Sequence, residues 1–258
     1  MNKKDLIIQL FNQNVRGKKP DVSNKTKEHD GKYGHWLEEQ FGITANGDNA
    51  PDLYGYELKN TTTSNKTTFG DWSADYYIYK DPKFYHIFKG NKVAERQNSF
   101  LYIFGQHNMK KDRYSWSGSP CPNINGYNSF GQVLKVTENN DIIAMYSYSH
   151  DQRINKATIV PLELQKDELI LAKWSKECIK RHFEDKFNVE GWFTCKQDAT
   201  GTYNEICFGL PMNYENWIIL VKKGVVFFDS GMYEGNPRPY SMWRASNNYW
   251  NSLIVERY

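Results

Sequence analysis

Hydrophobic residues recur at helical spacing in two stretches near the N-terminus. Residues 5–15 place Leu6, Ile7, Leu10 and Phe11 on one stripe, which predicts an amphipathic helix. Residues 31–41 predict a second helix, because their aromatic and aliphatic residues also fall near one stripe and Gly42 follows as a C-terminal cap. The polar, basic stretch 16–30 between them is expected to be a loop.

Shorter apolar runs along the rest of the chain predict strands. They lie at 54–60, 76–80, 84–88, 99–104, 131–136, 142–148, 189–195, 203–208 and 225–229. Further helices are expected at 166–187, 213–222 and 246–254, and the first of these has the clearest pattern. The order of these elements predicts an α/β (α+β) protein with a mixed β-sheet flanked by helices.

The chain is long enough for one large domain or for two lobes that share a core. It has 258 residues, of which 39% are hydrophobic. A soft boundary lies where "IVPLELQKDE" leads into the helix expected at 166–187. We therefore expect one lobe at 1–165 and another at 166–258. The polar stretch 105–129 is long for a loop in a compact domain, and such loops tend to be functional or disordered.

Composition excludes several classes of protein. No stretch reaches the apolar length of a membrane span, and the N-terminus fits an amphipathic helix better than a signal peptide. Cys121, Cys178, Cys195 and Cys207 are widely spaced without a CxxC pair, so we expect reduced thiols in a cytoplasmic protein. The HxxxH, GxSxG and GxxxxGK[ST] patterns are absent, which argues against zinc, a serine nucleophile and ATP.

Charge is distributed unevenly although the net charge is only +3. Residues 31–70 contain three lysines against five acidic residues, whereas residues 80–113 contain eight lysines and arginines against three acidic residues. An acidic pocket beside a basic stretch would suit a metal site next to a polyanion. Ordinary solvated surface charge explains the same distribution equally well.

The stretch "APDLYGYELKN", residues 50–60, carries charges in a run that otherwise reads as a buried strand. Side chains alternate between the two faces of a strand, so Glu57 and Lys59 share one face while Tyr56 and Leu58 point into a core. Asp52 lies just before the strand, after a proline. The alternation therefore brings two carboxylates and one ammonium to a single rim.

Two carboxylates at one rim suit a hard divalent cation such as Mg²⁺. Adjacent carboxylates repel each other unless a cation lies between them, and a lysine beside them can orient water or offset charge on a phosphate. The competing interpretation is an exposed edge strand that carries Glu57 and Lys59 by chance. The apolar neighbours, the glycine before Glu57 and the acidic helix upstream favour the metal site.

The longer stretch "GHWLEEQFGITANGDNAPDLYGYELKN" resembles the active-site block of the PD-(D/E)xK nuclease superfamily, in its MutH-like branch. Glu38 matches the glutamate of the helix, which ends in the pair Phe41-Gly42. Asp52, Glu57 and Lys59 match the catalytic triplet. The short gap between Asp52 and Glu57 is similar to that of monomeric type II restriction endonucleases of the MvaI and BcnI type, and the order of elements over 165–250 is more faintly similar.

This resemblance implies a restriction-endonuclease-like fold with two lobes around a DNA cleft, the first catalytic and the second for DNA recognition. It implies a Mg²⁺-dependent type II restriction endonuclease that cuts double-stranded DNA and leaves 5′-phosphate ends. Asp52, Glu57 and the Leu58 carbonyl would hold the metal, Lys59 would assist the attacking water, and Glu38 would support the site. The protein would act as a monomer, and a cognate DNA methyltransferase would belong to the same system without binding to it.

Candidate DNA-binding residues lie in three other stretches. Lys66 follows the catalytic triplet, and Lys110, Lys111 and Arg113 suit phosphate contacts in the 105–129 loop. The Pro/Gly-rich stretch 231–244 lies where the resemblance places a base-reading loop, and its candidates are Tyr233, Arg238, Tyr240, Ser241 and Arg244. A solvated loop lysine at 66, and arginines paired with carboxylates at 238 and 244, are the alternatives.

Two other functions fit the sequence. A MutH-like mismatch-repair nicking endonuclease would share the site, although the short gap between Asp52 and Glu57 argues mildly against it. A non-catalytic DNA-binding module would share the fold, but it would gain nothing from carboxylates held near phosphate.

Overall fold

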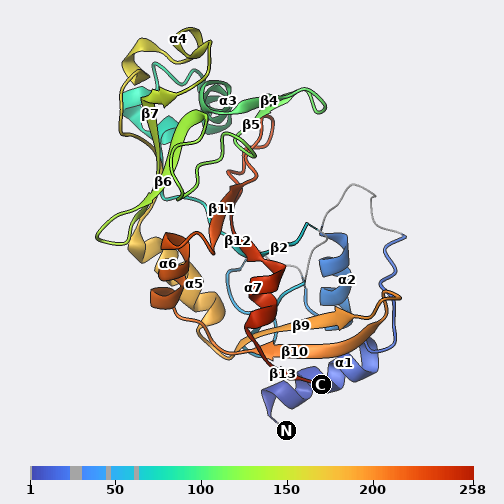
Figure 1. Cartoon of the computed structure of the whole chain (residues 1–258). Coiled ribbons are helices and arrows are strands. Elements are labelled where there is room, and N and C mark those ends of the chain that lie inside the picture. The colour runs from blue at the N-terminus through green and yellow to red at the C-terminus, as the bar shows by residue number, and fades with distance from the viewer. Residues whose placement is uncertain (1, 24–30, 45–47, 61–63) are drawn as a thin grey trace. The chain divides into compact units, whose positions relative to one another are not determined.

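The computed structural model describes residues 2–23, 31–44, 48–60 and 64–258 (Figure 1). The predicted loop 16–30 therefore lies only partly within the described residues. The chain divides into two compact units, each assembled from separate stretches of sequence. The first unit comprises Met1–Thr67, His182–Asn216 and Ala245–Tyr258, and the second comprises Thr68–Arg181 and Trp217–Arg244.

The predicted boundary near residue 165 falls inside the second unit, so the units are not the consecutive lobes 1–165 and 166–258. The reason is physical. A change of composition marks a break along the chain, whereas a compact unit is defined by contacts between segments that are distant in sequence. The catalytic and recognition roles given to the lobes stay predictions.

A four-stranded sheet forms the centre of the first unit. Its strand order is β1 (Tyr56–Leu58), β9 (Gly191–Gln197), β10 (Tyr203–Gly209) and β13 (Ile254–Arg257). The short β1 pairs in parallel with β9, with Glu57 opposite Trp192, and β10 is antiparallel to both β9 and β13. The strand that carries the charged motif is therefore fixed by a partner from far along the chain.

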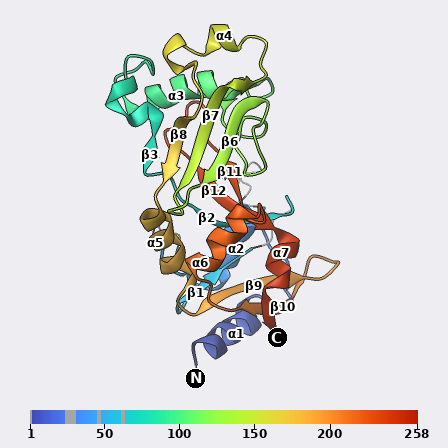
Figure 2. The same cartoon turned by 60° about the vertical axis from the view of Figure 1, so that its left-hand side comes forward.

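One face of this sheet packs against α1 (Lys3–Asn14) and α2 (Lys32–Gln40), the two N-terminal helices that the spacing predicts. A capping box between Asn2 and Asp5 begins α1. Tyr56 and Leu58 of β1 belong to the same buried cluster as Ile7, Phe11, Trp36, Leu37 and Phe41 of the N-terminal segment. Figures 1 and 2 show α1 running beside β10. This face supplies the hydrophobic core of the unit.

The opposite face packs against α7 (Asn247–Ser252) and the end of α5 (Lys176–Phe187). Trp250 of α7 contacts Trp192 of β9, with ring centres 5.0 Å apart, and Phe187 of α5, at 6.1 Å. Strand alternation directs Glu57 to the side away from Tyr56 and Leu58. The charged motif therefore faces α5.

The second unit contains an antiparallel sheet in the order β3 (Tyr76–Tyr77), β8 (Leu169–Trp174), β7 (Ile142–Asp151) and β6 (Phe130–Val136) (Figure 2). Helix α3 (Val93–Phe104) contributes to an aromatic core, in which Phe100 meets the Trp116 ring edge to face at 5.2 Å. The shorter helical elements of the second unit are η1 (Ile78–Lys80), η2 (Pro82–Phe84), α4 (Lys156–Ile159) and η3 (Leu162–Leu164).

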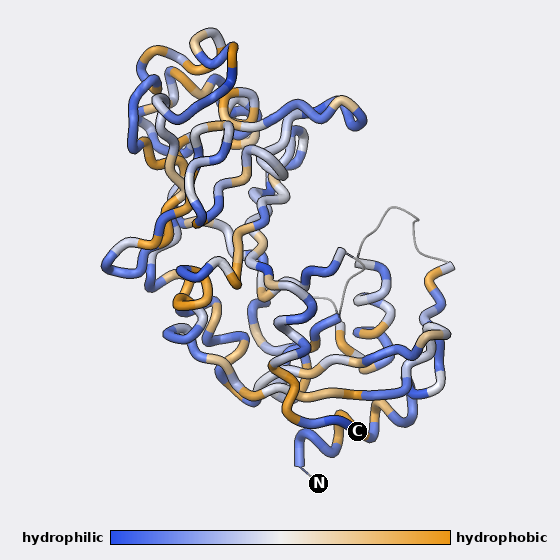
Figure 3. Tube along the Cα trace, in the orientation of Figure 1, coloured by the Kyte–Doolittle hydropathy of each residue, from blue (hydrophilic) through white to orange (hydrophobic). Residues whose placement is uncertain are grey.

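A three-stranded sheet and a hairpin complete the fold. The order of the sheet is β11 (Phe227–Ser230), β12 (Ser241–Ser246) and β2 (Lys66–Asp71). The hairpin joins β4 (Gln106–Asn108) to β5 (Arg113–Ser115) within the predicted 105–129 loop, and Figure 3 shows it as largely hydrophilic. Helix α6 (Tyr214–Lys222) matches the helix predicted at 213–222.

Three predicted elements are wrong. Residues 166–187 form strand β8 followed by helix α5, not one helix, because an apolar run such as "LILA" fits a buried strand as well as a helix. Residues 99–104 belong to α3, whose buried Gln97, Phe100, Leu101 and Phe104 follow helical spacing. Residues 84–88 form the end of η2 and the turn and bend that follow it, and η2 begins at Pro82 with a side-chain cap from Asp81.

Two further sequence expectations concern cysteines and membranes. All four cysteines are thiols without a disulfide, as predicted. No helix in the described part of the chain combines the length and the hydrophobicity needed to cross a bilayer.

The first residue of β9 provides a test of the sheet that positions β1. Gly191 has φ +114°, and a Cβ there would lie 2.4 Å from the Gly209 carbonyl oxygen. We expect Gly191→Ala to lower the free energy of unfolding by about 2–4 kcal/mol, because backbone strain and a backbone clash add. Urea denaturation measures this loss.

Gly17→Ala is the matched control. Gly17 also has a positive φ, +79°, but nothing lies within 4 Å of the added Cβ. Gly17→Ala should lower the free energy of unfolding by about 1 kcal/mol, from the backbone conformation alone. Equal losses for both variants would contradict the close approach of β9 to β10 at this position.

Candidate active site

A tight turn places Asp52 beside β1. Leu53 and Tyr56 exchange backbone hydrogen bonds of 3.0 and 2.8 Å across the turn. The two residues inside it, Tyr54 and Gly55, have positive φ values of 52° and 89°. The turn folds the chain back so that Asp52 Oδ2 accepts a hydrogen bond of 2.9 Å from the Leu58 N–H. The aspartate before the strand and the glutamate within it thus come to one rim.

Glu57 is buried among charged groups. Its side chain is 3% exposed, and its Oε1 lies 2.9 Å from Lys59 Nζ and 3.0 Å from Lys186 Nζ. The Oε2 atom is buried and has no hydrogen-bond partner among the described residues. Lys59 shares the face of Glu57, as strand alternation predicts, and its Nζ lies 5.2 Å from the centre of the Phe187 ring.

Burial and mutual repulsion perturb the ionisation of this group. The pKa of Asp52 is raised to about 7, first by burial and then by the nearby Glu57 carboxylate, against the opposing effects of Lys59, Lys186 and the Leu58 N–H. Burial lowers the pKa of Lys59, and the neighbouring Glu57 opposes this shift. A cation between the carboxylates would relieve the repulsion that raises the pKa of Asp52.

The chemistry of these donors fits a divalent cation. Two carboxylates face one rim, and the buried Glu57 Oε2 lacks a partner among the described residues. The part of the chain that the structure describes contains no group of three or more His, Cys, Asp or Glu side chains that could hold a metal. A metal here would therefore depend on Asp52 and Glu57, completed by backbone oxygen and water, which suits a hard cation.

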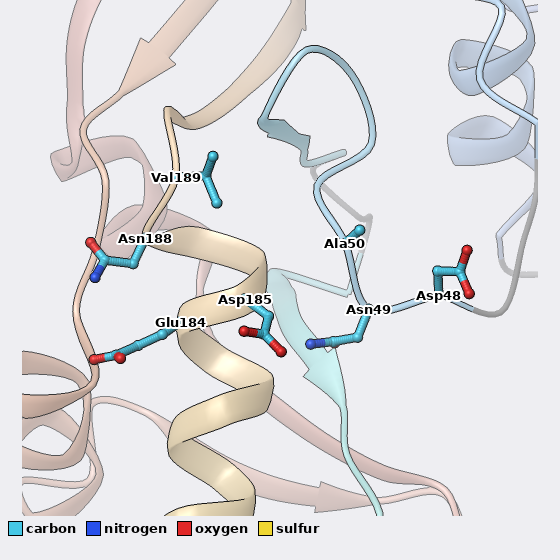
Figure 4. A pocket seen from close by; sticks show the side chains of 7 residues that line it. All are labelled: Asp48, Asn49, Ala50, Glu184, Asp185, Asn188 and Val189. Atoms are coloured by element: carbon cyan, nitrogen blue, oxygen red, sulfur yellow. The ribbon is translucent and has the colours of Figure 1, made fainter.

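An open pocket of about 610 Å³ adjoins the segments that carry Asp52 and Lys186 (Figure 4). Asn49 donates a hydrogen bond of 2.6 Å to the His182 carbonyl and ties the segment before Asp52 to α5. In Figure 4 the Asn49 side chain extends toward Asp185 on the helix. The lining residues are Asp48, Asn49, Ala50, Glu184, Asp185, Asn188 and Val189.

The structure gives less direct support for Glu38 and Lys66 as site residues. Among the described residues, no hydrogen bond or ion pair joins the Glu38 side chain to Asp52, Glu57 or Lys59, although α2 contributes to the same unit. Lys66 is half-buried at the start of β2. Their roles stay predictions.

The stretch 231–244 is not entirely a loop, because β12 begins at Ser241. Ser241 is fully buried, and its hydroxyl hydrogen-bonds with the Tyr77 hydroxyl and the Pro239 carbonyl. Arg244 lies in the same strand, with its side chain 19% exposed. It bonds Asp229 at 3.0 Å and the Thr68 hydroxyl at 2.9 Å. Neither side chain is presented to solvent as a loop residue would be.

Arg238 differs from Arg244 in exposure. Its side chain is 60% exposed, pairs with Asp71 at 2.7 Å, and lies over the Tyr240 ring at 4.8 Å. Part of the guanidinium therefore stays available to a ligand. The structure thus brings Arg238 and Tyr240 together, and both are more exposed than the buried Ser241.

The β4–β5 hairpin brings another predicted group together. Lys110 and Lys111 are exposed in its turn, and the Arg113 guanidinium stacks over the Tyr233 ring at 3.5 Å. A β-bridge between Ser115 and Tyr233 joins the hairpin to the stretch 231–244. Two stretches that the sequence presents as separate candidates are therefore one surface within the second unit.

Lys186 is the site residue that the sequence did not indicate. It lies near the end of α5 in an ordinary amphipathic helix, and no motif marks it. Only the packing of α5 beside β1 brings its ammonium to Glu57.

Comparison with solved structures identifies the fold. The chain is similar to restriction endonuclease MvaI in a complex with cognate DNA substrate, with a TM-score of 0.59 over 100% of this chain and 98% of that chain. The sequences are only 13% identical, so the likeness concerns the fold. The predicted restriction-endonuclease-like α/β fold is confirmed.

Sequence comparison identifies the family. The LlaMI restriction endonuclease family model matches residues 15–258. The chain is also 53% identical over 264 residues to the type II restriction enzyme ScrFI of Lactococcus lactis subsp. cremoris, covering 98% of this chain and 97% of that enzyme. The chain belongs to the LlaMI restriction endonuclease family, and the prediction of a type II restriction endonuclease is confirmed. This membership favours restriction over mismatch repair and over a non-catalytic module.

The raised pKa of Asp52 predicts how metal-free stability depends on pH. Folding favours the protonated carboxyl, so its contribution is fully present below the unfolded value of 3.8 and is lost as the pH rises through about 7. Asp52→Asn keeps an acceptor for the Leu58 N–H but removes the charge. In EDTA at pH 8 we expect this variant to be more stable than wild type by up to about 4 kcal/mol.

Chemical denaturation at pH 5 and pH 8 checks this difference. The advantage of Asp52→Asn should shrink toward pH 5, where both side chains are uncharged in the folded state. An advantage that does not change with pH would mean that the charge of Asp52 is not what destabilises the metal-free site.

Proposed function

We propose that this enzyme hydrolyses both strands of duplex DNA at a short specific sequence, using Mg²⁺ at Asp52 and Glu57. The observation that carries the proposal is the buried Glu57 carboxylate, which shares a rim with Asp52 and lies 2.9 Å from Lys59. A DNA-binding surface gains nothing from two carboxylates. In phosphodiester hydrolysis, by contrast, two carboxylates can hold a metal ion that polarises the phosphate. The cut would leave a 5′-phosphate and a 3′-hydroxyl.

Asp52, Glu57 and the Leu58 carbonyl would hold the ion, which when bound would supply a Lewis acid for the scissile phosphate and acidify water. Lys59 orients the attacking water and offsets charge that develops on the phosphate. Its low pKa, caused by burial, suits a group that handles a proton. Glu38 supports the site from α2 through water or through the arrangement of the adjoining segment.

We further propose that the surface formed by the hairpin and the stretch 231–244 contacts DNA. Lys110, Lys111 and Arg113 suit phosphate contacts, which position the protein without reading sequence. Lys66 takes a similar role near the cut. Arg238 and the neighbouring Tyr240 are the best placed to read base edges, whereas Tyr233 supports Arg113.

With one site per chain, each strand must be cut in turn or two chains must meet. We propose a monomer that cuts one strand, rebinds in the opposite orientation and cuts the other. Its setting would be the cytoplasm, where a cognate methyltransferase modifies the same sequence without forming a complex with this enzyme.

Substitution of Lys59 tests the active site. Lys59→Ala should abolish cleavage, because the water loses its orienting group, while DNA binding in EDTA stays near the wild-type level. Incubation with mixed plasmid DNA and Mg²⁺ measures cleavage, and a gel-shift assay measures binding. Wild type with EDTA is the control for metal-independent cutting. Discrete cleavage by the variant would contradict the assignment.

Substitution of the two arginines separates base reading from structure. Arg238→Ala should cost about 1–3 kcal/mol of binding at one specific base pair. Arg244→Ala should instead lower the free energy of unfolding by about 1–3 kcal/mol, because the Asp229 carboxylate and the Thr68 hydroxyl lose their bonds to the guanidinium. Binding to duplexes with single substitutions in the recognised sequence measures the first effect. A uniform loss of binding affinity across all duplexes would mean that Arg238 contacts phosphate and does not read a base.

A further inference from the structure

Lys186 is a second ammonium in a site where the metal chemistry needs only one. Its Nζ lies 3.0 Å from Glu57 Oε1, the same oxygen that Lys59 approaches at 2.9 Å. The side chains of Lys59 and Lys186 are only 12% and 16% exposed. Water therefore screens these charges weakly, and each of them affects the affinity of the site for a cation.

The end of α5 is held firmly enough to fix Lys186. Asn49 bonds the His182 carbonyl at 2.6 Å, and the Met212 N–H donates to the Phe187 carbonyl at 3.0 Å. Phe187 packs against Trp250 on the same face of the sheet. Lys186 therefore lies between two anchored points, which makes its approach to Glu57 part of the local architecture.

The formal charges explain what this ammonium does. With Asp52 ionised, as it must be to hold a cation, Asp52 and Glu57 would carry two negative charges against the two positive charges of Lys59 and Lys186, so this group would be balanced. A divalent cation would add two positive charges to this balanced group. The excess would be offset in part when a phosphodiester, with one negative charge, is also present.

We propose that Lys186 is a positioning residue that makes metal binding depend on DNA. In the DNA-free protein its ammonium neutralises Glu57 and weakens the site's affinity for a divalent cation. In the complex the same ammonium attracts the scissile phosphate, whose negative charge offsets part of the excess positive charge. The enzyme thereby binds its metal tightly only where there is DNA to cut. The inference rests on the proposed metal site at Asp52 and Glu57.

Removal of this charge tests the proposal without relying on cleavage. Mn²⁺ is titrated into the DNA-free protein, and its affinity is measured by calorimetry and by electron paramagnetic resonance of unbound Mn²⁺. We expect Lys186→Met and Lys186→Gln each to bind Mn²⁺ at least about tenfold more tightly than wild type. Lys186→Arg keeps the charge and should bind like wild type. A merely structural role would weaken metal binding and could not strengthen it.

Lys3→Met is the matched control. Lys3 also forms an ion pair in the first unit, with Glu190 at 2.7 Å, but its side chain is 55% exposed. This variant should leave Mn²⁺ affinity unchanged, which excludes a general effect of net charge. Circular dichroism and urea denaturation identify any variant that fails to fold, and the second neutral variant then carries the test.

Two outcomes would contradict different parts of this argument. If Asp52→Asn loses Mn²⁺ binding while both neutral variants at position 186 bind no more tightly than wild type, the inference about Lys186 is wrong and the metal site stands. If Asp52→Asn binds Mn²⁺ like wild type, the proposed metal site itself is wrong.

Discussion

Burial of the Glu57 carboxylate is the constraint on which the first unit depends. A charge removed from water must be compensated by nearby charges or hydrogen bonds. Lys59 supplies one ammonium from the position just after the same strand, but the second comes from Lys186 on α5. The parallel pairing of β1 with β9, and the contacts of Phe187 and Trp250, hold these elements in register. The same packing that stabilises the unit therefore also brings together the charges of its site.

The three residues of β1 have different roles on the two faces of the strand. Tyr56 and Leu58 join the hydrophobic cluster with α1 and α2, while Glu57 points to the opposite side. The strand is thereby anchored by apolar burial at the positions next to its charged residue. The protein can therefore hold a carboxylate whose burial is unfavourable, because the neighbouring side chains stabilise the strand that carries it.

Much of the fold could be predicted because hydrophobic spacing reports which side of an element is buried. Helices α1, α2 and α6 and strands β6, β7, β9 and β10 follow their predicted ranges closely. Two of the three errors share one cause. Residues 99–104 and 166–174 are dense in apolar and aromatic side chains, and a fully buried helix and a fully buried strand then look alike. Contacts with neighbouring elements decide between them, and a local pattern does not contain those contacts.

The sequence by itself determined the local part of the site, because strand alternation brings Glu57 and Lys59 to one face with Asp52 close before them in the chain, and those contacts span only a few residues. Tertiary structure decided the rest. It brought Lys186 to Glu57, buried Ser241 beside Tyr77 and joined the hairpin to Tyr233. It also divided the chain into units of interleaved segments. These outcomes depend on packing between residues far apart in sequence, which periodicity along the chain does not encode.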